Sequence, residues 1–175
     1  SSGVSKTNPI EVVGRPIVAG LKQIEKLRGT IGQKLGTVAN NLGRVTPEEM
    51  KPIILAELKR VPGLAGLKTT MLGALDFGDT VLATALSKSD RMAIRKIFAE
   101  AIKAGTGKQK HLLRQELFEI LGGQKSSLQA ITATQEKAFD AVRKGLSTVL
   151  EGKNSSYKTL SAKYAKLMRP LQDMR

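Results

Sequence analysis

Few residues of this chain could carry out catalysis, and each of them has a simpler structural interpretation. The sequence contains one histidine, His111, and no cysteine. A zinc site would therefore depend on carboxylates, which is uncommon, and disulfides and cysteine nucleophiles are excluded. A Ser-His-Asp triad would also need a nucleophilic serine, and no feature of the sequence marks one. We interpret His111, in the stretch GKQKHLLRQE, as a solvated residue on a helix surface.

Two further motifs invite a chemical interpretation. The stretch AGTGKQ at 104–109 is similar to a phosphate-binding loop, which requires Gly-x-x-x-x-Gly-Lys-Ser/Thr between a strand and a helix. Here Ile102 occupies the first glycine position, Gln109 replaces the hydroxyl residue, and a helix is expected before the loop. The adjacent carboxylates of Glu48 and Glu49 fall in the first turn of a predicted helix, where the helix dipole favours negative charge. The sequence therefore predicts no catalytic site, no cofactor and no metal ion.

Recurrent helix signals predict an all-α fold of about six helices, arranged as a bundle or an elongated array and partly similar to a coiled coil. Asn8 and Thr46 each precede a proline and a glutamate with the spacing of a capping box. Apolar residues then return every three or four positions, as on one face of a helix. The other starts are expected at Ser89 with Asp90, near Lys108, at Ser126 or Ser127, and at Asn154 or Ser155.

Strand signals are nearly absent, because the sequence has no alternating β-branched run and no Asn-Gly or Asp-Gly turn. The apolar middle of the chain is expected to form short buried helices around Leu64–Leu75 and Asp79–Leu86. Three consecutive segments follow from these elements: residues 1–45 with a long glycine-striped helix, 46–125 as a central bundle, and 126–175 with a long helix and a heptad-like terminal helix.

The first long helix carries a stripe of small residues beside its apolar seam, at Gly29, Gly32, Gly36, Ala39 and Gly43. Each glycine costs a helix about 0.8–1.0 kcal/mol relative to alanine, so the stripe needs a compensating role. A stripe without side chains lets another backbone approach closely. We therefore predict a helix-packing interface here, either within this chain or with another chain.

A second candidate contact surface is the regular apolar seam of the terminal helix. Its members are spaced by three and four residues, although Pro170 is expected to end or kink the helix before the last turn. The alternatives are packing onto the rest of the chain and contact with a partner. The predicted partner contacts are Tyr157, Leu160, Tyr164 and Leu167.

The chain is strongly basic, with 29 Lys and Arg against 15 Asp and Glu and a net charge of +14. Such a charge attracts nucleic acid, anionic lipid and acidic proteins. The few aromatic residues fall mostly on apolar stripes, which argues against single-strand stacking. A nucleic-acid-binding protein is one alternative function, with candidate contacts at Arg91, Arg95, Lys96, Lys103, Lys108, Lys110 and Arg114.

A membrane-surface helix is a third possibility. Lys22, Lys26 and Lys34 lie beside apolar residues of the first long helix, but no Trp or Phe anchors that helix. Charged residues interrupt every apolar stretch before it reaches the length of a membrane span. The sequence lacks a signal-peptide pattern and an initiator methionine, which favours a cytoplasmic or particle-bound location and a processed or partial chain.

The opening NPIEVVGRPIVAGLKQIEKL and the ending YKTLSAKYAKLMRPLQDMR resemble helical segments of large bacteriophage virion proteins, including the tape-measure type. Those proteins are long, cysteine-poor chains of helices. The resemblance implies a non-enzymatic structural role, with this chain as a portion of a longer polypeptide. The function expected from the sequence is thus a helical assembly module in a larger protein or particle, in contact with other chains or with itself.

Overall fold

The computed structural model describes residues 9–122 and 130–173. Over these residues it is mostly helical, with seven helices and only two small sheets, which confirms the predicted all-α fold. Contacts divide the chain into two compact units. We call Ser1–Val38 with Ser156–Arg175 the terminal unit and Ala39–Ser155 the central unit. This division joins the two ends of the chain and so runs across the three consecutive segments proposed from the sequence.

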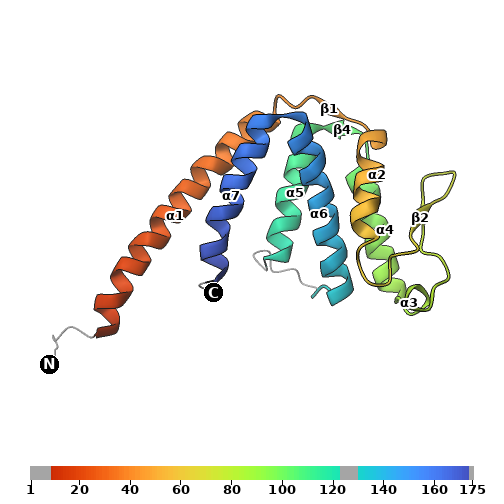
Figure 1. The fold of residues 1–175 in the computed structure, drawn as a ribbon, viewed down its shortest axis with the longest axis horizontal. Coiled ribbons are helices and arrows are strands. Elements are labelled where there is room, and N and C mark those ends of the chain that lie inside the picture. The colour runs from red at the N-terminus through yellow and green to blue at the C-terminus, as the bar shows by residue number, and fades with distance from the viewer. Residues whose placement is uncertain (1–8, 123–129, 174–175) are drawn as a thin grey trace. The chain divides into compact units, whose positions relative to one another are not determined.

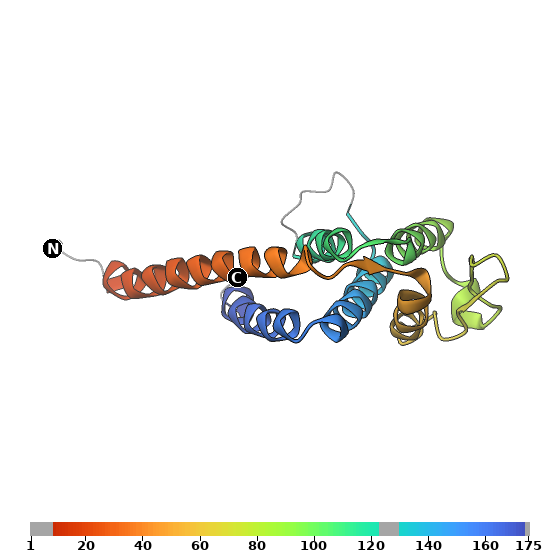
Figure 2. The ribbon, with the colours of Figure 1, turned by 90° about the horizontal axis from the view of Figure 1, so that it is seen from above.

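The terminal unit consists of α1 (Pro9–Ala39) and α7 (Ser155–Asp173). The two helices run near each other only along the C-terminal part of α1 and diverge toward its N-terminus (Figures 1 and 2). Of the two effects expected of Pro170, an end or a kink, the end is wrong, because α7 continues past this residue to Asp173. A proline removes one backbone hydrogen bond, here the bond to the carbonyl of Lys166, and the last residues remain helical without it.

In the central unit, α6 (Ala133–Lys153) is the helix that the others share (Figure 1). It packs against α2 (Pro47–Leu58), α4 (Lys88–Ile102) and α5 (Gly107–Leu121). The core side chains recur every three or four residues on each helix, as expected for amphipathic helices that bury one face. They include Met50, Ile54, Leu58, Ile94, Phe98, Leu117, Ala138, Val142, Leu146 and Leu150, each no more than 2% exposed.

Gly145 allows the closest approach within this core. A Cβ atom built on Gly145 of α6 would lie 2.8 Å from Cγ1 and 3.0 Å from Cα of Ile54 on α2. The second of these neighbours is backbone and cannot rotate away. Helices α2 and α6 can therefore pack at this distance only because position 145 has no side chain.

Hydroxyl side chains begin the helices of the central unit. Thr46 forms the predicted capping box with Glu49, and Thr106 forms a second one with Gln109. The Glu49 carboxylate also pairs with Lys153 at 2.6 Å. This ion pair and the backbone N–H of Thr46 lower the pKa of Glu49 to about 2. Both caps satisfy backbone amides that the first turn of a helix leaves without intrahelical partners.

Two starts differ from the predictions. The cap of α4 is Ser87 rather than Ser89, and α6 begins at Ala133 with Thr132 as its cap. The predicted starts at Ser126 and Ser127 lie outside the described residues. Serine, threonine and aspartate all cap helices well, so a run such as Ser87-Lys88-Ser89-Asp90 offers several starts, and tertiary contacts select among them.

The buried carboxylate of Asp90 explains why both helices start where they do. Its Oδ1 accepts hydrogen bonds from Thr132 Oγ1 at 2.8 Å and from Gln135 Nε2 at 2.9 Å. Burial alone would raise the pKa of Asp90, but hydrogen bonds from Thr132, Gln135 and Ser87 outweigh it, and the pKa is lowered. Asp90 therefore connects the N-terminus of α4 to the N-terminus of α6.

A two-stranded ladder sets the N-termini of α2 and α5 beside each other. Strands β1 (Arg44–Val45) and β4 (Gly105–Thr106) pair antiparallel, with Arg44 opposite Thr106. Strand β1 is followed by the capping Thr46 of α2, and β4 ends on Thr106, the cap of α5. Two helix–strand–helix segments thus meet through their strands.

The apolar middle of the chain is mainly a hairpin rather than the predicted helices. Strands β2 (Lys68–Thr69) and β3 (Leu75–Asp76) pair antiparallel, and only α3 (Val81–Thr84) is helical before α4. The expected helix at Leu64–Leu75 is therefore wrong, whereas α3 falls within Asp79–Leu86. Positive φ angles at Gly63, Gly73 and Gly78 impose turns that a helix cannot contain.

Candidate interaction surfaces

In the terminal unit, the glycine stripe and the terminal seam meet each other. A Cβ atom built on Gly32 would lie 3.9 Å from Cε2 of Tyr164, and Gly36 is buried. Tyr157 is fully buried, while Leu160 and Leu167 are half-buried. At Gly32 and Tyr164, therefore, the two candidate surfaces contact each other within this chain.

The remaining small residues of the stripe lie elsewhere. Gly29 is exposed, and a Cβ atom there would meet no atom within 4 Å. Ala39 is buried in the central unit. Gly43 lies beyond the end of α1 with φ of 71°, and its carbonyl accepts a hydrogen bond from the amide of Gly107. Its conformation makes it a turn residue rather than a helix-packing residue.

We expect Gly32→Leu to destabilise the terminal unit and Gly29→Leu to be tolerated. The Cβ of a leucine at position 32 would already touch the Tyr164 ring at 3.9 Å, so we expect the larger side chain to crowd it, whereas a Cβ at position 29 meets nothing within 4 Å. Overpacking of this kind costs about 1–3 kcal/mol. Chemical denaturation of both variants checks the difference. Equal stability of the two would show that α1 and α7 do not pack through Gly32.

The basic residues on α4 and α5 that the sequence suggested as nucleic-acid contacts fall into two groups, those held within the central unit and those open to solvent at least in part. Lys110 is only 5% exposed, and its ammonium donates to the Glu100 carbonyl at 3.1 Å. Arg91 donates to the Ala83 carbonyl at 2.6 Å and lies over the Phe77 ring. Both side chains therefore stabilise the central unit. The other candidates are Arg95, Lys96 and Lys103, which are exposed, and Lys108 and Arg114, which are half-buried.

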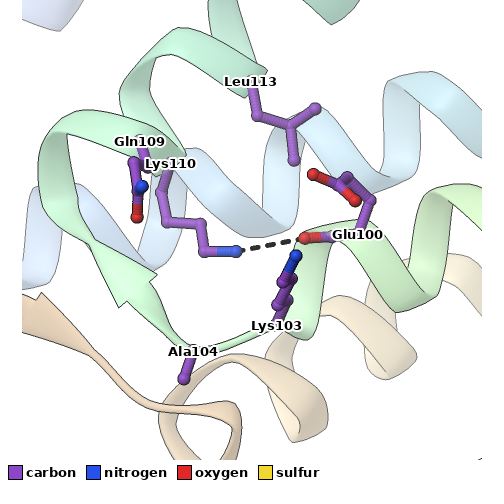
Figure 3. Close-up of a pocket in the computed structure, with 6 residues that line it drawn as sticks. All are labelled: Glu100, Lys103, Ala104, Gln109, Lys110 and Leu113. Carbon is purple, nitrogen blue, oxygen red and sulfur yellow. Dashed lines mark hydrogen bonds between the residues drawn. The ribbon is translucent and has the colours of Figure 1, made fainter.

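A pocket of about 180 Å³ lies where α4 ends and α5 begins (Figure 3). In Figure 3 the Lys110 side chain runs along the pocket toward the last carbonyls of α4. Burial lowers the pKa of Lys110, although the nearby Glu100 carboxylate acts in the opposite direction. Small-molecule sites usually measure about 300–1,000 Å³. The geometry is that of a buried lysine that caps the C-terminus of α4, where cations are favoured.

The loop AGTGKQ does not present its amides to a phosphate group. The amide of Gly107 donates to the Gly43 carbonyl at 2.6 Å, and that of Gln109 donates to Thr106 Oγ1 at 3.1 Å. The Leu42 side chain packs directly against Gly107 and occupies the space of a Cβ atom. A phosphate-binding loop needs its amides open to the ligand, so this geometry gives no support to a nucleotide site.

His111 is buried rather than solvated, contrary to the interpretation from the sequence. The residue is 1% exposed and lies one helical turn after the buried Gly107 on α5. Burial, together with the charges of Arg114 and Lys108, lowers the pKa of His111 to about 4. The spacing of four residues between Gly107 and His111 was the one sequence signal for this burial.

Among the described large apolar residues, the four with the highest exposed fractions lie between α2 and α4. The sequence interpretation missed this surface. Met71 and Leu72, at the hairpin tip, are 105% and 97% exposed, and Val81 and Leu82, on α3, are 84% and 63% exposed. Both views place the hairpin and α3 at the same end of the central unit (Figures 1 and 2). We call these four residues the apolar loop surface.

The described residues contain no group of three His, Asp or Glu side chains that could hold a metal ion. Among the same residues, no helix is long and apolar enough to cross a membrane. No protein-family model, curated protein or solved structure shows significant similarity to the chain. Proposals about function therefore rest on the surfaces described above.

Proposed function

We propose that this chain is a non-enzymatic helical module that assembles with other protein chains, as components of large particles such as bacteriophage virions do. The observation that carries the proposal is the exposure of the apolar loop surface. Turn tips are usually built from Gly, Pro, Asn, Asp and Ser. Here Gly73 makes the turn, but Met71 and Leu72 occupy the tip beside it and are almost fully exposed.

The segment that carries these residues is held in a fixed conformation. Two hydrogen bonds join Thr70 and Ala74, the residues on either side of the tip. The Thr70 amide donates to the Ala74 carbonyl at 2.8 Å, and the Thr70 hydroxyl accepts from the Ala74 amide at 3.2 Å. Leu64, Leu67 and Phe77, which flank the hairpin in the sequence, are buried. An ordered loop loses little conformational entropy when it binds, which favours association. Each of the four exposed side chains could contribute about 1.5–3 kcal/mol if a partner buried it fully.

The test is a loop variant that combines Met71→Ser with Leu72→Ser. Because both side chains are exposed, we expect its unfolding free energy to stay within about 0.5 kcal/mol of the parent. We expect the parent protein either to self-associate in light scattering across the micromolar range or to bind a protein encoded beside it. The loop variant should lose that association.

A matched control combines Met92→Ser with Leu112→Ser, which removes two exposed apolar side chains from α4 and α5. This control should associate as the parent does. A parent protein that stays monomeric and binds none of the neighbouring gene products would refute the proposal. If both double variants lost association equally, the apolar loop surface would not be the contact site, and this part of the proposal would be wrong.

A further inference from the structure

The positive charge is concentrated in the terminal unit. Its 58 residues hold eleven Lys and Arg against three Asp and Glu, a net charge of +8, whereas the 117 residues of the central unit hold eighteen against twelve, a net charge of +6. The terminal unit thus carries more than half of the charge on one third of the chain. Within residues 20–38 and 156–167 the only acidic side chain is Glu25.

Several bases of the central unit are paired or buried, although others are exposed. In the central unit, Lys153 pairs with Glu49, Arg143 and Lys144 pair with Asp140, and Lys110 is buried. In the described part of the terminal unit, six lysines are exposed and none forms an ion pair with a described carboxylate. These are Lys22, Lys26, Lys34, Lys158, Lys163 and Lys166, which we call the terminal lysines.

From this arrangement we propose that the terminal unit binds duplex nucleic acid through phosphate contacts of the terminal lysines. Lysine acts on phosphate as a point charge and does not read bases, so binding is independent of sequence. None of the described aromatic side chains is exposed, and the stacking platform of a single-strand binder is therefore missing from the described residues. The proposal is independent of the apolar loop surface.

Contacts within the terminal unit favour nucleic acid over a lipid surface as the polyanion. A helix that lies in a membrane interface inserts its apolar face into the lipid. In α1, Leu35 and Gly36 are buried and Gly32 faces Tyr164, so part of that face is already covered. The lysines remain available without any such insertion, as phosphate neutralisation requires.

The experiment measures fluorescence anisotropy of a labelled DNA duplex with the full chain at a series of salt concentrations. One variant changes all six terminal lysines to glutamine. The control variant changes six exposed lysines of the central unit in the same way, namely Lys59, Lys68, Lys88, Lys96, Lys103 and Lys137. Circular dichroism and thermal unfolding confirm that both variants remain folded.

We expect the parent to bind the duplex with an affinity that falls steeply with salt. The terminal variant should bind at least about 30-fold more weakly, and the magnitude of its salt slope should fall by about 0.9 for each phosphate that the substituted lysines no longer neutralise. The control should bind less than about fivefold more weakly, an effect of total charge alone. Equal weakening in both variants, or no duplex binding at low salt, would overturn the proposal. Binding to phosphatidylserine vesicles without duplex binding would also overturn it and would indicate a membrane surface instead.

Discussion

Gly145→Ala is expected to lower the unfolding free energy of the protein by about 1–3 kcal/mol, although alanine is the better helix former. The new methyl group would lie 2.8 Å from Ile54 Cγ1 and 3.0 Å from Ile54 Cα, so α2 and α6 must move apart along their contact. Overpacking a core typically costs this much. Chemical denaturation monitored by circular dichroism measures the change.

Gly152→Ala is the matched control, because it lies on the same helix and a Cβ atom there would meet nothing within 4 Å. We expect this variant to be as stable as the parent or up to about 1 kcal/mol more stable, from helix propensity alone. If Gly145→Ala were stabilising to the same degree, α2 and α6 would not pack at the distance described.

The second large effect is a loss of stability in weak acid that depends on His111. The folded protein holds this imidazole neutral with a pKa of about 4, against 6.5 for the free side chain. Between these values the unfolded chain binds a proton that the folded chain does not, so stability falls as pH falls. We expect His111 to account for roughly 2–3 kcal/mol of this loss between about pH 7 and pH 4.

Comparison with His111→Leu isolates the contribution of the histidine. Carboxylates with lowered pKa values, such as Glu49 and Asp90, also cost stability in acid, but only below their unfolded values near pH 4.5 and 3.8. These carboxylates lose the same stability in the parent and in the His111→Leu variant, so their effect cancels in the comparison. The difference in unfolding free energy between parent and variant should therefore change with pH mainly from 6.5 to 4. A constant difference would mean that His111 is solvated and titrates normally.

The features that the sequence predicted correctly are those whose causes act within one helical turn. The capping box of Thr46 and Glu49 involves residues three apart, and the signal and the structure coincide. The 3–4 spacing of apolar residues indicated helices because it too is a local pattern.

The features that the sequence did not reveal depend on residues far apart in the chain. Gly145 appears as an ordinary glycine until Ile54, 91 positions earlier, is placed against it. His111 is likewise buried only once α5 has packed against α6, β1 and β4. The hairpin of β2 and β3 has no Asn-Gly or Asp-Gly turn and closes through Gly73 with φ of 82°, so its apolar composition was mistaken for that of a buried helix.

The central position of α6 also has a consequence for synthesis on the ribosome. Helices α2, α4 and α5 are complete when residue 121 has been made, but each of them buries its apolar face mainly on α6, which ends at Lys153. Until that segment emerges, the growing chain exposes Ile54, Ile94 and Leu117 to water or to a chaperone. The central unit therefore folds late in translation, when its last helix closes the core.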